Sequence, residues 1–363
     1  MKIERFALYR YFNLLHRPLP VPGAAITERE GVLLQLTADS GEVGWGEIAP
    51  LAGVSPESLS EAVDASVALL PALRGVVLDA QLILSPSTES PCIGLPPSAA
   101  FGVECAMLDL LCSASRVPLR RVCGVNPANT IRVNALLSVE DETLEERAAQ
   151  LNEEGVPAIK IKIGRGDPKE EGERVRNLAR TVTGQTPLRL DANRAWELSE
   201  AELFLAALQA APVEYFEEPL RDSSGLPELV RRWDLPLALD ESLLEPDFGG
   251  LDAAGPIAAV VLKPSRLGRV GTTLNWAQQA CDAGAYSVIS SLYESGVGTR
   301  VLAQLAACVN TKDVPCGLDP HRWIREDIVD AGLPAGGWQI DLEQIDRTIP
   351  VVETGRLEEI SNG

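Results

Sequence analysis

The sequence predicts an α/β protein: a modified (β/α)8 TIM-like barrel with an N-terminal α+β capping domain that the C-terminal segment completes. Three observations support this fold class. Short β-branched runs alternate with helical stretches from residue 131 onward, strand-like and helical patterns mix before that point, and the alternation stops after residue 324. We therefore predict a capping domain at 1–130, a barrel at 131–324 and a segment at 325–363 that returns to the capping domain.

The barrel prediction depends on eight apolar runs short enough to be buried parallel strands. They are IRVNALL near 131, AIKIKI near 160, PLRLDA near 190, VEYFEEP near 215, PLALDES near 239, IAAVVLKP near 261, AYSVISS near 288 and VPCGLD near 316. Helical stretches lie between them, including 145–154, 170–181, 199–210 and 270–283. No GxGxxG fingerprint follows a strand, so a closed barrel is favoured over an open doubly wound sheet.

The first part of the chain mixes both kinds of element. GVLLQLTA (31–38) alternates like a strand, DSGEVGWGE (39–47) is typical of turns, and helical segments follow at 55–73 and 98–115. Ser55, which precedes Pro56 and Glu57, marks a helix start by its residue types.

Composition argues against several classes of function. The net charge is −20 and no basic run is present, so neither nucleic acid nor an anionic membrane surface is an expected partner. No uninterrupted apolar run predicts a spanning helix, and the N-terminus lacks the apolar core of a secretory signal. The seven cysteines form no CxxC pair, which favours reduced thiols in a cytoplasmic protein. Only two histidines, His16 and His321, are present, which argues against a His-based zinc site or a Ser-His-Asp triad.

Charged residues recur where the predicted barrel strands end. Taken alone, AIKIKIGR (158–165) reads as an edge strand whose two lysines face solvent. One strand–helix unit later comes an aspartate, and further charged residues follow at steps of 26, 23 and 23 residues. The full series is Lys160, Lys162, Asp191, Glu217, Asp240 and Lys263. Because the carboxyl ends of barrel strands meet at one face, we expect these side chains to share a site.

The residue types indicate the chemistry of that site. Three carboxylates on adjacent strands, Asp191, Glu217 and Asp240, form an all-oxygen set that suits Mg²⁺. A lysine becomes a general base when its pKa falls toward 7, and the adjacent positive charges of Lys160 and Lys162 press in that direction. The reaction that suits such a site is proton abstraction next to the carboxylate of a small-molecule substrate.

At these residues the sequence resembles the enolase superfamily, in its muconate-lactonizing subgroup, over essentially the whole chain. KIK at 160–162, Asp191, Glu217, Asp240 and Lys263 all fall on the family motif. The resemblance implies that Asp191, Glu217 and Asp240 are Mg²⁺ ligands. It also implies that Glu218 and Glu241 support them without binding the metal.

Within the subgroup the chain most resembles the o-succinylbenzoate synthases. The matching stretches are GWGEIAPL (44–51), PSAAFGVECAMLDL (97–110), LRLDANRAW (188–196), ALDESLLEPDF (238–248), LKPSRLG (262–268), ISSLYESGVG (289–298) and GLD (317–319). The resemblance implies dehydration of 2-succinyl-6-hydroxy-2,4-cyclohexadiene-1-carboxylate to 2-succinylbenzoate, a step of menaquinone or phylloquinone biosynthesis. Lys162 is then the base and later the acid, Lys160 polarises the substrate carboxylate, and Lys263 stabilises the intermediate.

Two competing functions remain open. Other members of the superfamily racemise N-acylamino acids or epimerise dipeptides with the same two lysines. Dipeptide epimerases typically carry Asp-x-Asp at the last strand, where this chain has Gly317-Leu318-Asp319, so the dipeptide reading is weaker. The other alternative is a barrel that has lost catalysis, but none of the expected carboxylates or lysines is missing.

Further residues are predicted to support the site or touch the substrate. Arg189, two positions before Asp191, points the same way by strand alternation, and Asn193 follows in the next loop. Ser290 and Ser291 end the seventh predicted strand and offer hydrogen-bond donors. By the resemblance, the segments at 14–30 and 50–58 are candidate loops that close over the barrel mouth, and Tyr293 departs from the small or aliphatic residue common there. The sequence predicts no particular oligomeric state.

Overall fold

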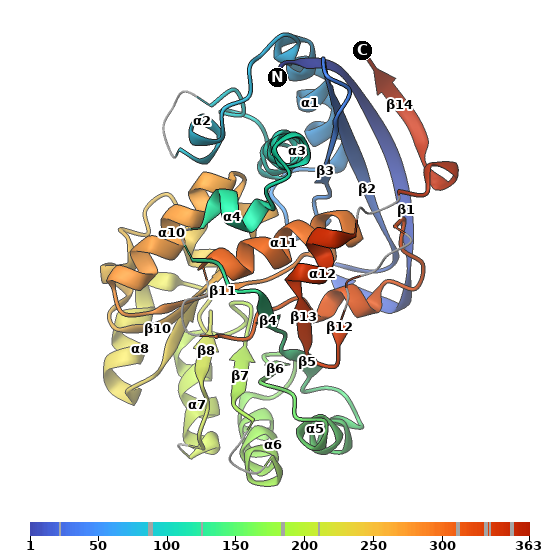
Figure 1. Cartoon of the computed structure of the whole chain (residues 1–363). Coiled ribbons are helices and arrows are strands. Elements are labelled where there is room, and N and C mark those ends of the chain that lie inside the picture. Colours follow the sequence, from blue (N-terminus) through green and yellow to red (C-terminus); the bar gives the residue numbers. More distant parts are fainter. Residues whose placement is uncertain are drawn as a thin grey trace.

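The computed structural model describes residues 1–21, 23–85, 90–124, 126–182, 186–209, 211–309, 313–329, 333, 335–348 and 352–363. Figure 1 shows a curled parallel sheet wrapped by helices in the lower part of the view, and a long antiparallel sheet beside helices in the upper part. This is the architecture that the predicted fold class requires.

The upper part is built on a four-stranded antiparallel sheet in the order β14-β1-β2-β3. Its strands are β1 (Ile3–Val21), β2 (Ala24–Ala38), β3 (Val43–Ile48) and β14 (Glu358–Asn362). The helices α1 (Leu59–Leu73) and α3 (Pro97–Ser115) lie beside it, and α2 (Ala80–Leu84) packs against α3 on the side away from the sheet (Figure 1). Helix α3 approaches β3 closely because Gly46 has no side chain: a Cβ there would lie 1.9 Å from the Gly102 carbonyl oxygen.

Helix α1 begins one turn later than the sequence predicted. Ser58, not Ser55, caps it: the Ser58 side chain accepts from the Glu61 backbone N–H, and the Glu61 carboxylate accepts from the Ser58 N–H. The Ser55 hydroxyl instead accepts a hydrogen bond from the Leu51 N–H, which keeps residues 51–55 in a tight turn.

The lower part is a parallel sheet whose seven strands follow one another in chain order within the described residues. They are β5 (Ala135–Ser138), β6 (Ile159–Lys162), β7 (Leu188–Asp191), β8 (Tyr215–Glu217), β9 (Leu237–Leu239), β10 (Ile257–Leu262) and β11 (Tyr286–Ile289). The connecting helices are α5 (Leu144–Glu153), α6 (Pro168–Thr181), α7 (Leu198–Leu208), α8 (Leu226–Trp233), α9 (Pro264–Leu267), α10 (Val270–Asp282) and α11 (Gly296–Val309). The strands are short, so the charged residues at their carboxyl ends lie close to the sheet.

The first and last predicted barrel strands differ from the structure. IRVNALL is divided: β4 (Thr130–Arg132) pairs with β13 (Gln339–Asp341), and only β5 joins the parallel sheet. Residues 316–317 form isolated bridges, to Val133 on one side and to Ser290 on the other, rather than a strand. Pro315 has no N–H to donate to a ladder, which limits pairing there. These bridges nevertheless span the gap between β11 and the β4–β5 region.

The C-terminal segment touches both parts of the molecule. Strand β13 pairs with β4 and with β12 (Ala335–Gly336), and helix α12 (Leu342–Arg347) lies against β4. Nearby in the chain before β4, helix α4 (Leu119–Cys123) packs on α11. Strand β14 then pairs with β1, with Ala7 opposite Asn362. The return of the chain end to the antiparallel sheet is therefore visible, while the exact division at 130 and 324 stays a prediction.

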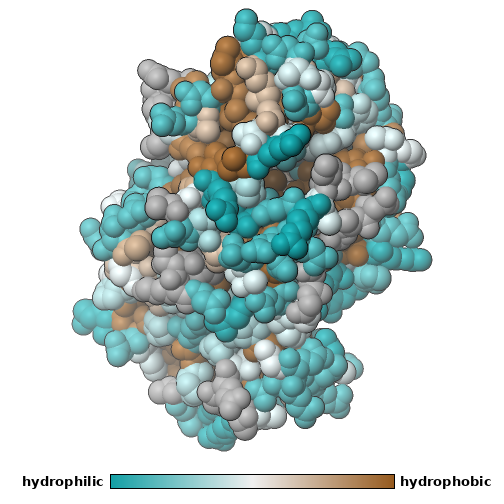
Figure 2. Space-filling view, viewed as in Figure 1, coloured by the Kyte–Doolittle hydropathy of each residue, from teal (hydrophilic) through white to brown (hydrophobic). Residues whose placement is uncertain are grey.

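Helix α3 is the one described helix that is long and apolar enough to cross a membrane by length and composition. It is mostly buried inside the protein, against β3 and β2, as expected of the core helix of a globular protein. The face shown in Figure 2 is largely hydrophilic, with hydrophobic atoms gathered mainly in its upper part.

Candidate active site

The charged residues of the sequence series come together at the carboxyl ends of neighbouring strands. Lys160 and Lys162 lie on β6, Asp191 ends β7 and Glu217 ends β8. Asp240 and Lys263 directly follow β9 and β10. The parallel register places Lys162 beside Asp191 and Asp191 beside Glu217, so the side chains meet across strands.

Lys160 is buried between two carboxylates. Its ammonium nitrogen lies 2.7 Å from Oδ2 of Asp191 and donates to both carboxylate oxygens of Glu217, at 2.7 and 2.6 Å. Both partner carboxylates are fully buried. Burial disfavours a charged lysine, but the two carboxylates outweigh it, and the pKa of Lys160 rises well above its usual value.

Lys162 lies nearer the open side of the site, with 24% of its side chain exposed against 8% for Lys160. Its ammonium donates to Oδ2 of Asp191 at 2.6 Å and to Oδ1 of Asn193 at 2.7 Å. Desolvation lowers the pKa of Lys162, and the neighbouring charges of Lys160 and Lys263 act in the same direction against the pull of Asp191. The net direction is downward, as the sequence predicted.

Lys263 and Asp240 form a buried ion pair on the other side of the site. Burial disfavours the charge on Lys263, but Asp240 and then Glu241 more than offset it, so the pKa of Lys263 is raised. Arg266, one helical turn further on α9, lies 4.0 Å from Asp240 and 3.8 Å from Glu241.

Glu218 lies behind this layer as a buried anchor. One of its carboxylate oxygens accepts the backbone N–H groups of Asp240 and Ser242, each at 2.8 Å. The other accepts the Ser242 hydroxyl at 2.9 Å and the Arg194 guanidinium at 3.1 Å. Glu218 therefore fixes the backbone that carries Asp240, which agrees with a supporting role.

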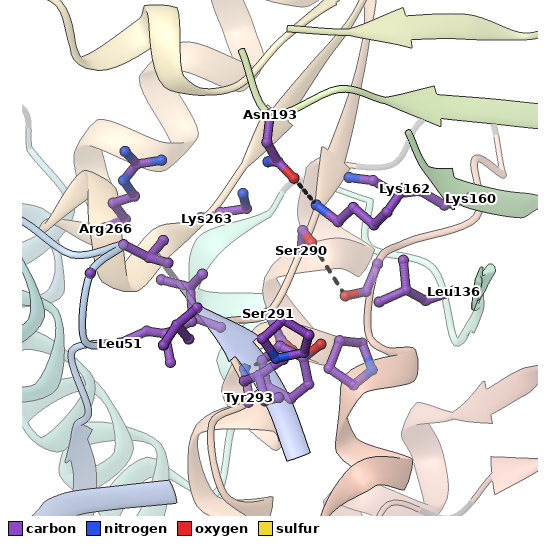
Figure 3. Close-up of a pocket in the computed structure, with 18 of the residues that line it drawn as sticks. Leu51, Leu136, Lys160, Lys162, Asn193, Lys263, Arg266, Ser290, Ser291 and Tyr293 are labelled. Atoms are coloured by element: carbon purple, nitrogen blue, oxygen red, sulfur yellow. Dashed lines mark hydrogen bonds between the residues drawn. The ribbon is translucent and has the colours of Figure 1, made fainter. Parts of the chain in front are cut away.

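The lysines open onto a cavity of about 510 Å³. Figure 3 shows Lys160 and Lys162 on one side of it and Lys263 with Arg266 on the other. Of the predicted supporting residues, the cavity is lined by Asn193, Glu241, Ser290, Ser291 and Gly317. The Ser290 hydroxyl lies 3.4 Å from the Gly317 carbonyl oxygen, so these two positions close the wall next to Lys160.

The antiparallel part of the molecule supplies an apolar wall of the same cavity. Leu19 and Val21 come from the end of β1, and Leu51 and Val54 come from the segment after β3. The segment at 14–30, predicted as a loop, is instead the tip of the β1–β2 hairpin apart from Pro22, which lies outside the described residues. Tyr293 faces this wall and packs edge-on against Trp323, with ring centroids 5.5 Å apart.

Arg189 does not reach the cavity. It is fully buried, and its guanidinium donates to Glu214 at 2.6 Å, to the Pro315 carbonyl oxygen at 2.7 Å and to Asn134 at 3.3 Å. Strand alternation does turn it to the same side of β7 as Asp191, but of its described partners Asn134 alone lines the cavity. It ties β7 to the segment that bridges the sheet.

The carboxylates have the chemistry of a divalent-cation site. Each of Asp191, Glu217 and Asp240 holds an ammonium group at hydrogen-bond or ion-pair distance, so each already binds a cation. Burial and the charge of Asp191 raise the pKa of Glu217 to about 8, against the lowering effect of Lys160. Among the described residues, however, no three acidic, His or Cys side chains surround one point, and the lysines stand between the carboxylates and the cavity. The donor types fit Mg²⁺, whereas the present arrangement is that of ammonium-bound carboxylates.

Arg266 and Arg194 are among the charged residues of the site that were not singled out from the sequence. Arg266 lines the cavity, and Arg194 contacts Glu218 and Glu245. Both lie inside motifs that point to the site, LKPSRLG and LRLDANRAW. Each lies three residues after a charged residue at a strand end, and this spacing could have indicated from the sequence that they belong to the site.

Comparison with known families gives two matches. Residues 143–343 match the "Enolase C-terminal domain-like" family, and residues 3–110 match "MenC, N-terminal domain". Among curated proteins, the chain is 30% identical to an o-succinylbenzoate synthase of Yersinia enterocolitica, covering 97% of each chain. It is 32% identical to one of Yersinia pseudotuberculosis, over 90% of this chain and 94% of that protein.

Solved structures with the same fold include two epimerases. The L-Ala-D/L-Glu epimerase of Bacillus subtilis superposes with a TM-score of 0.81 at 25% identity, covering 94% of this chain and 96% of that one. A dipeptide epimerase of Enterococcus faecalis, complexed with Mg and a dipeptide, gives a TM-score of 0.79 at 22% identity, with 94% and 97% covered. These likenesses confirm the predicted fold class and leave the reaction to be argued from the site.

Proposed function

Because this chain belongs to the enolase superfamily and, within it, to the o-succinylbenzoate synthase family, we propose that it dehydrates 2-succinyl-6-hydroxy-2,4-cyclohexadiene-1-carboxylate to 2-succinylbenzoate. The reaction removes a proton next to a carboxylate and then expels water, and aromatisation of the ring favours the product. The downstream pathway that we propose is menaquinone or phylloquinone biosynthesis.

The observation that carries this proposal is the separation of the three lysines by their surroundings. Lys160 and Lys263 are buried against carboxylates that raise their pKa values, so both remain cations. Lys162 is more exposed to the cavity, and its pKa is lowered. One lysine is thus suited to proton transfer and two are suited to hold negative charge.

The residues that would hold Mg²⁺ are Asp191, Glu217 and Asp240, and Glu218 would keep the Asp240 backbone in place. When bound, the ion would supply Lewis-acid stabilisation of negative charge on the substrate carboxylate. Lys160 and Lys263 contact these carboxylates, and both also line the cavity that would receive the substrate.

The lysines would then act in sequence. Lys162 accepts the proton from the carbon next to the carboxylate, and its ammonium form then donates a proton to the departing hydroxyl group, so that water leaves. Lys160 holds the carboxylate end of the substrate, and Lys263 faces the ring from the opposite side, where a cation is attracted to a π system. Asn193 keeps Lys162 oriented through its 2.7 Å hydrogen bond.

The test is loss of the diene absorbance when the cyclohexadiene substrate is added. Turnover should require Mg²⁺, disappear after treatment with EDTA and return when Mg²⁺ is restored. Asp240→Asn should need at least about tenfold more Mg²⁺ for half-maximal rate, because it removes one charged ligand. The matched control is Asp252→Asn, an exposed position outside the site. Full activity in EDTA would remove the metal from the proposal.

Racemisation of N-acylamino acids is the second candidate. It is favoured by the position of Lys162 and Lys263 on opposite sides of the cavity (Figure 3), the arrangement that a two-base reaction needs. It is disfavoured because the pKa of Lys263 is raised, so Lys263 stays protonated and is a poor base. Parallel assays of dehydration, of N-succinylamino acid racemisation and of dipeptide epimerisation separate these functions.

A further inference from the structure

We propose that Arg165 receives the terminal carboxylate of the succinyl chain and thereby selects dicarboxylate substrates. This inference rests on the proposed function, since it concerns the second carboxylate of that substrate. The first carboxylate lies next to the proton that Lys162 removes. The second needs its own partner, because a charged group that enters a cavity without one loses its hydration uncompensated.

Elimination among the cations of the cavity points to Arg165. Five cationic side chains of the described residues line it: Lys160, Lys162, Arg165, Lys263 and Arg266. Four of them lie within 4.0 Å of a carboxylate of the protein. In the part of the chain that the structure describes, Arg165 has no such partner, so its charge is available to a ligand.

The backbone around Arg165 is held in place although its side chain is free. The N–H groups of Gly164, Arg165 and Gly166 all donate to the carboxylate of Glu171, at 2.6, 2.7 and 2.6 Å. Glu171 is itself 6% exposed and lies on α6. Gly164 has a φ of +74°, and a Cβ at this position would lie 2.5 Å from the Ala195 Cβ. The loop is therefore locked to α6 and to the loop after β7.

This anchoring gives Arg165 the properties of a recognition residue. Because the backbone is already held, only the exposed Arg165 side chain has to be ordered when a ligand binds, and its planar donors match a carboxylate. It follows β6 by three residues, so it lies on the Lys162 side of the mouth, away from Lys263. A ligand that places one carboxylate near Lys160 can extend its second carboxylate toward Arg165 along the same wall.

The experiment compares two ligands with and without the terminal carboxylate. Isothermal titration with saturating Mg²⁺ would use the product 2-succinylbenzoate and its analogue 2-butanoylbenzoate, in which a methyl group replaces that carboxylate. Arg165→Gln should weaken binding of 2-succinylbenzoate about tenfold and of 2-butanoylbenzoate less than about twofold. In turnover, KM should rise by a similar factor with kcat nearly unchanged.

Arg165→Lys should recover part of the affinity, because it keeps the charge without the planar fork, and it serves if the glutamine variant folds poorly. Arg121→Gln, an exposed position outside the cavity lining, is the matched control and should bind both ligands as the unmodified protein does. Equal weakening of both ligands, or no weakening of either, would overturn the role of Arg165. An unmodified protein that neither dehydrates the diene nor binds 2-succinylbenzoate would instead overturn the proposed function, and this inference with it.

Discussion

At the scale of single residues, identical side chains acquire different properties from their neighbours. Lys160 and Lys162 are two positions apart on β6, yet the first contacts two carboxylates and the second contacts one carboxylate and an amide. The pKa of the first is raised and that of the second is lowered. The difference comes from partners on β7 and β8, so it belongs to the folded protein and not to the KIK motif.

The role of Lys162 can be tested by truncation. Lys162→Ala should lower kcat about a thousandfold, since general acid–base catalysis contributes about 10²- to 10⁴-fold. Thermal unfolding followed by circular dichroism should be little changed, because this lysine is partly exposed. Lys169→Ala, on the exposed side of α6, is the control and should keep full activity. Substantial turnover by Lys162→Ala would assign the proton transfer to another residue.

The predicted site residues differ in how far the sequence alone could place them. The strand-end series was placed correctly because chain order and strand direction put those side chains on one face. Arg189 was turned to the correct side by alternation, but its partners Glu214 and Pro315 are distant in sequence and no local pattern indicates them.

At the scale of elements, the contact between α3 and β3 depends on a polar anchor within an apolar surface. Asp109 of α3 accepts a hydrogen bond from the backbone N–H of Trp45 at 2.8 Å. Burial raises the pKa of Asp109 to about 6, against the lowering effects of this hydrogen bond and of Arg300. The carboxylate is therefore held where its charge is unfavourable.

This shift predicts a pH-dependent effect on stability. An acid whose pKa is raised by folding contributes stability below its unfolded pKa of about 3.9 and loses it as the pH rises through about 6. Asp109→Asn keeps the acceptor without the charge. It should match the unmodified protein near pH 4 and exceed it by up to about 3 kcal/mol at pH 8. Urea unfolding at both pH values measures the difference.

The control for this prediction is Asp64→Asn, an exposed position on α1. Its stability relative to the unmodified protein should stay constant between the two pH values. If the stability difference between Asp109→Asn and the unmodified protein were also the same at both pH values, the charge of Asp109 would not destabilise the folded protein.

At the scale of the whole molecule, buried carboxylates join the antiparallel part to the barrel. Glu47 of β3 accepts from the backbone N–H groups of Ser295 and Gly298, both at 2.8 Å, and so satisfies the start of α11. Glu104 of α3 accepts a hydrogen bond from the backbone N–H of Val270, at the start of α10, at 2.9 Å. Since α11 follows the segment that carries Ser290 and Ser291, the upper part helps to position the cavity wall.

Cooperativity between the two parts follows from these contacts. Glu47→Ala should lower the free energy of unfolding by about 3 kcal/mol, because buried N–H groups lose a charged acceptor. Unfolding in urea should remain one transition, reported alike by tryptophan fluorescence and circular dichroism. Glu4→Ala, at an exposed position on β1, is the control. Two separate transitions in the unmodified protein would contradict this coupling.

The set of charged groups that meet at the site was largely contained in the sequence. Residue types at strand ends, spaced by one strand–helix unit, determine which groups meet, because parallel strands present their carboxyl ends on one side. The small-molecule carboxylate substrate, the absence of nucleic-acid and membrane partners and the cytoplasmic location follow from composition or resemblance and stay predictions.

The tertiary structure alone decided how those groups and the segments around them are arranged. It split the first barrel strand, reduced the last to two bridges, and made the 14–30 segment a hairpin tip at the cavity. It also left Arg165, on an anchored loop, without an acidic partner among the residues that the structure describes. These outcomes depend on contacts between residues far apart in the chain, and on which charges are desolvated together, neither of which local periodicity records.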